Sequence, residues 1–352
     1  MLALNSPGIG SISALVLVER LARRPCRTWR ELRGQMYHDT QDGPLVDVRP
    51  QRRHGEKPMD TTSSSGEADP SSLGEGGQWS RQETSSAWAA NDDLFEGMTG
   101  SLTEAVVERA ELRPGLAVLD LACGTGKMAL FVAEQVTSAG TVYASDVSAG
   151  MLDVARHNAV LRGVANVRFQ LADAHRLPFP DHAFDRVLCR LGVMFFRAAT
   201  DALDEVRRVL TKDGRAVFLA WGRHDTPFFQ TTLDVMTERL GVPSSLRGTP
   251  VPFRFAERGL LASAFRSAGF STVVEERRDV AIRWSGSAQE FVRWRLETSS
   301  GPFQALFHEL VSGLKPSARE RLSVEMINRV GEYEQDSTVS LPAEVVLIVA
   351  SP

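Results

Sequence analysis

This chain of 352 residues has few cysteines, no long apolar runs and only a small excess of one charge. Its three cysteines, Cys26, Cys123 and Cys189, are too few and too scattered for a disulfide framework, which predicts a reducing, cytoplasmic location. No apolar stretch reaches the roughly 18 residues that a membrane span requires, so no membrane span is expected. The net charge of −4 offers no basic excess for nucleic acid, and no nucleic-acid partner is expected.

The N-terminal part of the chain differs from the rest in composition. Residues 59–77 are rich in Ser, Gly and Glu and have almost nothing to bury, so we expect 1–76 to be a disordered extension. Residues 1–58 hold 10 Lys and Arg against 6 Asp and Glu, yet acidic residues interrupt the basic helix that a transit peptide would need. The favoured interpretation is that translation starts at Met59, which would leave 1–58 outside the native protein.

Residues 77–352 show the pattern of one α/β domain, in which strand-like and helix-like segments alternate with short links. Such alternation predicts right-handed crossovers and a parallel sheet. Two further strands, near 271–284 and 343–350, would complete a sheet of seven strands, with the last strand antiparallel. The other strands are expected at 116–121, 141–146, 166–171, 184–190 and 214–221, and the helices at 102–112, 126–137, 149–161, 199–210 and 256–268.

The most informative segment is the apolar strand 116–121 with the glycine turn that follows it. The strand carries Asp120 near its end, and the turn contains Gly124 and Gly126, after which a helical pattern begins at once. Glycines allow a ligand to lie against bare backbone. A strand, a glycine turn and a helix N-terminus together predict a nucleotide-type site at the carboxyl edge of the sheet. Asp120 places a negative charge where a dinucleotide's pyrophosphate would lie, and it suits a cationic amine instead.

A dinucleotide site is the main competing interpretation. Gly124, Gly126 and Ala129 fit the loose G-x-G-x-x-G/A pattern, and Asp146 follows at about the spacing of a ribose-binding acid. S-adenosylmethionine (SAM) and NAD both contain adenosine, so Asp146 suits either. Asp120 and a further acid at the next strand end, Asp173, favour SAM. A NAD-dependent oxidoreductase stays an alternative.

These segments resemble the class I SAM-dependent methyltransferases, and especially the branch of ubiquinone/menaquinone C-methyltransferases. The resemblance implies a Rossmann-like seven-stranded sheet with helices on both faces, SAM as the cofactor, and no metal. It spans roughly a third of the chain. The four segments that carry it are VLDLACGTG (118–126), VYASDVSAGML (142–152), FQLADAHRLPFPDHAFDRVLC (169–189) and LDEVRRVLTKDGRAVFLAW (203–221).

The resemblance also implies roles for individual residues. Asp120 would face the methionine amino group, Asp146 the ribose hydroxyls, Met151 the adenine face and Asp173 the adenine amino group. The residues expected to bind the cofactor are Asp120, Ala122, Cys123, Gly124, Gly126, Asp146, Val147, Met151, Asp173, Ala174 and Arg190.

Two segments, 223–255 and 285–340, exceed what the sheet requires and are expected to be helical lid insertions. The second segment has helical stretches at 288–297, 303–314 and 317–333. Aromatic residues favour a small, mostly apolar acceptor, although the acceptor atom and the oligomeric state do not follow from the sequence. The aromatic residues expected at the acceptor side are Phe195, Phe196, Phe228, Phe229, Phe253, Phe255, Trp294 and Phe303. His224 and Glu297 are the candidate catalytic residues. The alternative for His224 is a solvated loop position. A nucleic-acid methyltransferase and a SAM-binding protein without turnover are the other functions left open.

Overall fold

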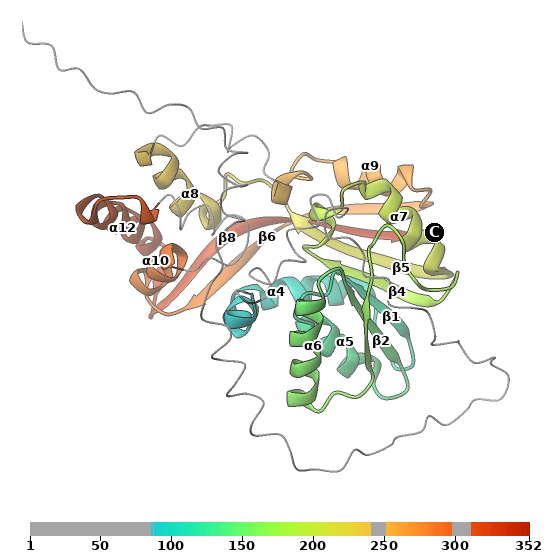
Figure 1. Ribbon diagram of the computed structural model, residues 1–352. Helices are drawn as coiled ribbons and strands as arrows, with labels where there is room; N and C mark the ends of the chain where they lie inside the picture. The colour runs from blue at the N-terminus through green and yellow to red at the C-terminus, as the bar shows by residue number, and fades with distance from the viewer. Residues whose placement is uncertain (1–85, 87, 241–250, 298–310) are drawn as a thin grey trace, which may run out of the picture. The chain divides into compact units, whose positions relative to one another are not determined.

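The computed structural model describes residues 86, 88–240, 251–297 and 311–352 (Figure 1). The predicted disordered extension 1–76 and the alternative start at Met59 therefore lie outside the described residues. So does most of the helix expected at 303–314.

The strands form one sheet in the order β3-β2-β1-β4-β5-β8-β6. Strand β8 runs antiparallel to both β5 and β6, whereas β1 to β5 pair in parallel. A two-residue strand, β7, pairs with β8 at the side of this path. The predicted mostly parallel sheet with an antiparallel last strand is thus confirmed. The strand bounds are β1 Ala117–Leu121, β2 Thr141–Asp146, β3 Val167–Leu171, β4 Phe184–Arg190, β5 Leu210–Trp221, β6 Thr272–Ser285, β7 Glu334–Gln335 and β8 Thr338–Ser351.

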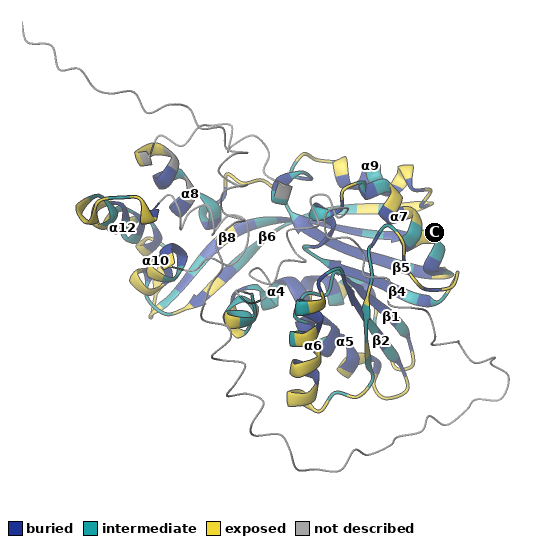
Figure 2. Cartoon of the chain, in the orientation of Figure 1, coloured by how far each residue is buried: buried dark blue, intermediate teal, exposed yellow. Residues whose placement is uncertain are grey.

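Helices cover both faces of the sheet, and each face has its own apolar cluster. One face packs against α4, α5, α8, α10 and α12, and the other against α7 and α9. Figure 2 shows β1, β4 and β5 mostly in the buried colour between these layers. The helix bounds are α4 Asp92–Ala110, α5 Lys127–Val136, α6 Ala149–Arg162, α7 Ala199–Val209, α8 Pro227–Leu240, α9 Leu260–Ser267, α10 Ala288–Glu297 and α12 Pro316–Gly331.

Helix α7 illustrates why these segments fold as they do. Its buried residues, Ala199, Ala202, Leu203, Val206 and Val209, recur every three or four positions and form one apolar stripe. Charged residues occupy the other positions of the helix. The stripe packs against the sheet, so burial of one face stabilises the helix more than its intrinsic propensity does.

Several element boundaries differ from the sequence-based expectation, among them the starts of α4, β5 and α9. Helix α4 begins at Asp92, ten residues earlier than expected, because packing against the sheet outweighs the low helix propensity of Gly97 and Gly100. Strand β5 begins at Leu210, four residues earlier than expected, and its pairing with β4 has a register shift between Phe184 and Arg186. Helix α9 begins only at Leu260, after a glycine with a positive φ of 84°.

Strands β6 and β8 extend well beyond the part of β8 that pairs with β5. They pair along their whole length, from Thr272 opposite Ser351 to Ser285 opposite Thr338. Strand β5 pairs only with residues 345–350 of β8, so the remainder of β6 and β8 forms a two-stranded ribbon. Helices α8, α10 and α12 gather around this ribbon (Figure 1). The segments predicted as insertions therefore build an extension of the apolar core.

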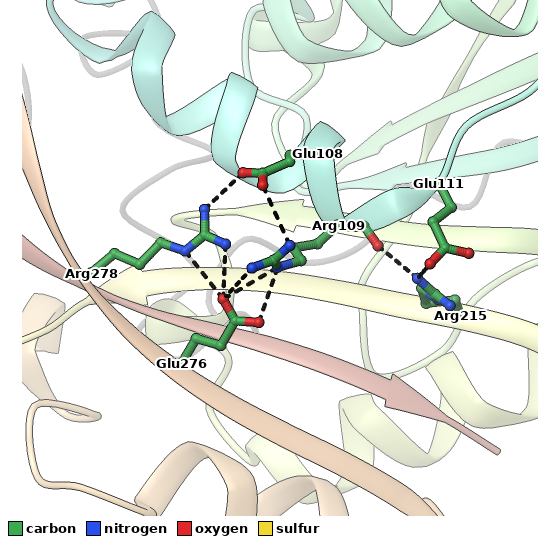
Figure 3. Close-up of polar contacts among 6 residues, drawn as sticks. All are labelled: Glu108, Arg109, Glu111, Arg215, Glu276 and Arg278. Atoms are coloured by element: carbon green, nitrogen blue, oxygen red, sulfur yellow. Dashed lines mark hydrogen bonds and ion pairs between the residues drawn. The ribbon is translucent and has the colours of Figure 1, made fainter.

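An ion-pair network fixes the C-terminal end of α4 to strand β6 (Figure 3). Arg278 donates to Glu108 at 2.8 Å and to Glu276 at 2.8 Å, and Arg109 donates to Glu276 at 2.9 Å. Arg215 of β5 pairs with Glu111 at 2.6 Å. Several of these side chains are largely exposed, so solvent screens the pairs and each contributes little stability by itself. Their joint effect is to set the position of α4, whose N-terminal half reaches the candidate site.

Candidate active site

A cavity of about 350 Å³ lies at the carboxyl ends of the parallel strands. This is the edge where open α/β sheets bind their ligands. All of the predicted cofactor-binding residues except Gly126 line it, namely Asp120, Ala122, Cys123, Gly124, Asp146, Val147, Met151, Asp173, Ala174 and Arg190. The fold thus brings together residues that are spread over about 70 positions of the sequence. Their contacts with a cofactor stay a prediction.

Gly126 has a different position from the other predicted residues. It precedes α5 with a φ of 80°, and a Cβ at this position would lie 2.8 Å from the Cβ of Ala155 in α6. The glycine therefore allows the N-terminus of α5 to pack closely against α6.

Asp120 is the most deeply buried carboxyl group of the cavity. Its side chain is 1% exposed, and among the described residues neither oxygen has a hydrogen-bond partner. Burial raises the pKa of Asp120 to about 8, the nearby Asp146 adds to this rise, and the charge of Arg190 opposes it. A buried carboxyl in this state would be stabilised as an anion by a cation entering the cavity.

We expect this carboxyl to make the stability of the free protein depend on pH. Its pKa is about 8 in the folded protein, against an ordinary value of 3.8 for an aspartate side chain. Between these values the folded protein holds a proton that the unfolded chain has released. The free energy of unfolding should therefore fall by up to about 1.4 kcal/mol per pH unit as the pH rises from about 4 to about 8. Asp120→Asn should remove this contribution.

Urea unfolding of the wild type and of Asp120→Asn at pH 5, 6.5 and 8 measures the effect. The stability of the wild type should decline relative to that of the variant as the pH rises. Asp153→Asn, at an exposed position of α6, is the control and should follow the wild type. Equal pH slopes for the wild type and Asp120→Asn would show that this carboxyl is already ionised.

Asp146 holds the glycine turn against the end of β2. Its Oδ2 accepts a hydrogen bond from the backbone N–H of Gly124 at 2.8 Å, and its Oδ1 accepts one from that of Ser148 at 2.9 Å. Burial raises the pKa of Asp146, and these backbone donors oppose the rise. Ser148 in turn caps α6 by accepting from the N–H of Met151. Each carboxylate oxygen has a second lone pair that can accept from a ligand.

Asp173 forms a local unit with His175. Its Oδ1 accepts from the backbone N–H of His175 at 2.9 Å and lies 2.6 Å from the ring Nδ1. The backbone N–H of Ala198 donates to Nε2 of the same ring at 3.2 Å. Burial works to raise the pKa of Asp173, but the hydrogen bonds from His175 outweigh it, and the pKa is lowered.

Helix α4 contributes polar groups that the sequence did not reveal. Arg190 donates to Glu96 at 3.0 Å and to Thr103 at 2.6 Å, which ties α4 to the end of β4. At the start of the helix, Lys127 pairs with Asp92 at 2.9 Å. Glu96 and Asp92 both line the cavity. No local motif marks them, because their partners lie 35 and 94 positions away and only the fold brings them together.

The other part of the cavity is aromatic. The rings of Phe229 and Phe253 are 4.7 Å apart, and those of Trp221 and Phe229 are 5.3 Å apart. Of the aromatic residues expected at the acceptor side, Phe255 belongs instead to the apolar cluster on the opposite face, and Phe303 lies outside the described residues. The aromatic residues that line the cavity are Trp88, Phe95, Phe195, Phe196, Trp221, Phe228, Phe229, Phe253 and Trp294.

The two candidate catalytic residues are not among those lining this cavity. His224 is exposed, with its ring 5.7 Å from that of Phe253, and Glu297 is exposed beside a separate depression formed with Trp284. Their catalytic roles stay predictions. Helix α10 instead presents Trp294 and Arg295 to the cavity. The sequence pattern could have indicated that Arg295 faces inward, because this residue lies on the apolar stripe of the helix.

Within the part of the chain that the structure describes, no group of three or more His, Cys, Asp or Glu side chains could hold a metal ion. None of the helices described is long and apolar enough to cross a membrane.

Comparison with known proteins shows that the chain is similar to methyltransferases. Residues 118–214 match the family described as a methyltransferase domain. The chain is 37% identical over 145 residues to a ubiquinone/menaquinone biosynthesis C-methyltransferase of Ectopseudomonas mendocina, covering 41% of this chain and 57% of that relative. It is 38% identical over 134 residues to the enzyme of that name in Azotobacter vinelandii, covering 38% and 53%.

Among solved structures, the chain is similar to the YcgJ protein of Bacillus subtilis. The sequences are 21% identical, the TM-score is 0.47, and the match covers 72% of this chain and 98% of that one. The match of residues 118–214 to the methyltransferase-domain family, together with the two relatives, makes the chain similar to SAM-dependent methyltransferases. The chain spans about half the length of the curated relatives it matches.

Proposed function

We propose that the protein is an enzyme that transfers a methyl group from SAM to a small, mostly apolar molecule. The observation that carries this proposal is the two-part cavity. Its one side has the glycine turn and three carboxylates at successive strand ends, and its other side has aromatic residues from α4, β5 and the two insertions. The first side suits a cationic adenosine derivative, and the second suits an apolar acceptor.

The residues present fit SAM by their chemistry. Asp120 would receive the methionine ammonium group, because it is a buried carboxyl without another partner among the described residues. Asp146 would accept from the ribose hydroxyls through its remaining lone pairs, and Asp173 would accept from the adenine amino group. When bound, SAM supplies a methyl group on a sulfonium centre. The protein's contribution is then to align the two molecules and exclude water.

The acceptor is less defined than the cofactor. The relatives are named for ubiquinone and menaquinone biosynthesis, and a quinone-type ring would suit the aromatic wall. However, the family match ends at residue 214, before both insertions, which supply much of that wall. We therefore propose an apolar, ring-containing acceptor without extending the relatives' substrate to this chain.

Transfer of label from methyl-labelled SAM tests the proposed function. The full chain is incubated with quinol precursors, phenols, amines and aromatic acids, and products are separated by chromatography. We expect label in at least one acceptor with the wild type, and much less label with Asp146→Ala when the SAM concentration is near the dissociation constant of the wild type. SAM binding without transfer to any acceptor class would favour the alternative of a SAM-binding protein without turnover.

A further inference from the structure

Lys127 is a buried cation directly after the glycine turn. It is the first residue of α5, it is 5% exposed, and its ammonium group lies 2.9 Å from Asp92 and 2.7 Å from Asp93. The dipole of a helix disfavours a cation at this position, and the first turn of α5 has no acidic residue to offset it. Burial works to lower the pKa of Lys127, but the hydrogen bonds with both carboxylates of α4 outweigh it, and the pKa is raised. Helix α4 therefore provides the charge that Lys127 needs.

Asp92 connects this cation to the wall of the cavity. Its Oδ2 accepts from Lys127 and, at 2.8 Å, from Nδ2 of Asn158. The same Nδ2 also donates to the carbonyl of Thr125 in the glycine turn at 3.0 Å. Asp92 lines the cavity with a side chain that is 11% exposed. Helices α5 and α6 thus both hold the first turn of α4 (residues 92–95) beside the glycine turn.

The middle of α4 is weaker than its two ends. Gly97 and Gly100 lie there, and a Cβ at either position would meet nothing within 4 Å, so close packing does not require these glycines. Glycine inside a helix is destabilising relative to alanine. Thr99 donates from Oγ1 to the carbonyl of Phe95 at 2.7 Å, a type of hydrogen bond that often bends helices. The C-terminal end of α4 is fixed to β6 by the network of Figure 3, so bending at the glycines would move the first turn alone.

We propose that Lys127 is a positioning residue that holds the first turn of α4 closed over the cofactor side of the cavity through Asp92. The glycines in the middle of α4 act as the hinge when SAM enters and S-adenosylhomocysteine leaves. This inference rests on the proposed function and adds a control of cofactor exchange to the same site. Breaking the contact between Lys127 and Asp92 should then speed the exchange.

The rate at which S-adenosylhomocysteine dissociates tests this role. Stopped-flow mixing with the full chain, followed by tryptophan fluorescence, gives the rate constants, because Trp88 and Trp294 line the cavity. Lys127→Met removes the charge and keeps most of the stem. We expect it to raise the dissociation rate constant at least about 10-fold, the effect of losing a hydrogen bond between charged groups. An unchanged rate constant in Lys127→Met would overturn the proposal.

Two further changes test whether Lys127 acts through Asp92. Asp92→Asn should also speed dissociation, and the double variant should be no faster than the faster single variant, because both changes break the same contact. Asp93→Asn is the matched control, since this carboxylate is 97% exposed and is not among the described residues that line the cavity. It should stay within about 3-fold of the wild type. Additive effects in the double variant, or an equal effect of Asp93→Asn, would contradict a role through Asp92.

A general loss of stability has its own control. Val206→Ala removes buried methyl groups from α7 on the opposite face of the sheet, so it should lower the melting temperature and leave the dissociation rate constant unchanged. Gly97→Ala should stiffen the hinge and slow dissociation about 3- to 5-fold. This variant also decides the question if Lys127→Met does not fold. Faster dissociation in Val206→Ala, or an unchanged rate constant in Gly97→Ala, would overturn the proposal.

Failure of this inference differs from failure of the proposed function. If the wild type binds S-adenosylhomocysteine but no variant changes the rate constant, the role of Lys127 fails and the methyltransferase proposal stands. If the wild type binds neither SAM nor S-adenosylhomocysteine, the proposed function itself fails.

Discussion

Replacing Asp146 with alanine is expected to weaken SAM binding about 30- to 150-fold. The carboxylate would accept hydrogen bonds from both ribose hydroxyls, and their loss should cost about 2–3 kcal/mol. The structure adds a second reason, since Asp146 also accepts from the N–H of Gly124 and so holds the glycine turn in place. Titration calorimetry with SAM on both proteins measures the change.

Two further variants of this experiment separate contact with SAM from loss of structure. Asp146→Asn keeps the shape and one acceptor oxygen, and its affinity should lie between those of the wild type and Asp146→Ala. Asp153→Ala removes an exposed carboxylate from α6 and should leave SAM binding unchanged. Thermal melts confirm that each variant is folded. A dissociation constant that does not change in Asp146→Ala would sink the assignment of this residue to the cofactor.

Gly126→Ala is expected to lower the free energy of unfolding by about 2–5 kcal/mol. The φ of 80° strains any residue with a Cβ by about 1–2 kcal/mol, and the contact with Ala155 adds an overpacking penalty of about 1–3 kcal/mol. Both effects arise at the N-terminus of α5, directly after the glycine turn. Urea unfolding of the wild type and the variant provides the measurement.

Gly163→Ala is the matched control for this change. Gly163 ends α6 with a φ of 65°, and a Cβ there would meet nothing within 4 Å. Its replacement should therefore show the backbone strain without the clash and cost about 1 kcal/mol. If both variants lose the same stability, α5 and α6 have room to separate and the close approach at Gly126 is not a constraint.

The cofactor side of the site could be predicted because its determinants are local. A buried strand, a glycine turn and a helix follow each other within 20 residues, and parallel strands bring their carboxyl ends to one edge. Asp120, Asp146 and Asp173 each stand at such an end, so their convergence followed from the strand assignments alone. Helix boundaries were less predictable where glycines weakened the pattern, as in the first half of α4.

The acceptor side depends on long-range packing, which no local pattern specifies. Whether Glu297 or Arg295 turns toward the cavity depends on how α10 lies on the ribbon of β6 and β8. The apolar stripe of α10 includes Phe291, Val292 and Arg295, whereas Glu297 falls on the exposed side. The packing of α10 therefore decides which of its side chains line the cavity, and the catalytic role of Glu297 stays a prediction.

Titration calorimetry of the full chain with SAM, S-adenosylhomocysteine and NADH tests the central claim most directly. We predict that SAM and S-adenosylhomocysteine each bind at one site per chain and compete with each other. We also predict that NADH does not bind. Binding of NADH without binding of SAM would contradict it, because the carboxylates that line the cavity would then accommodate a pyrophosphate.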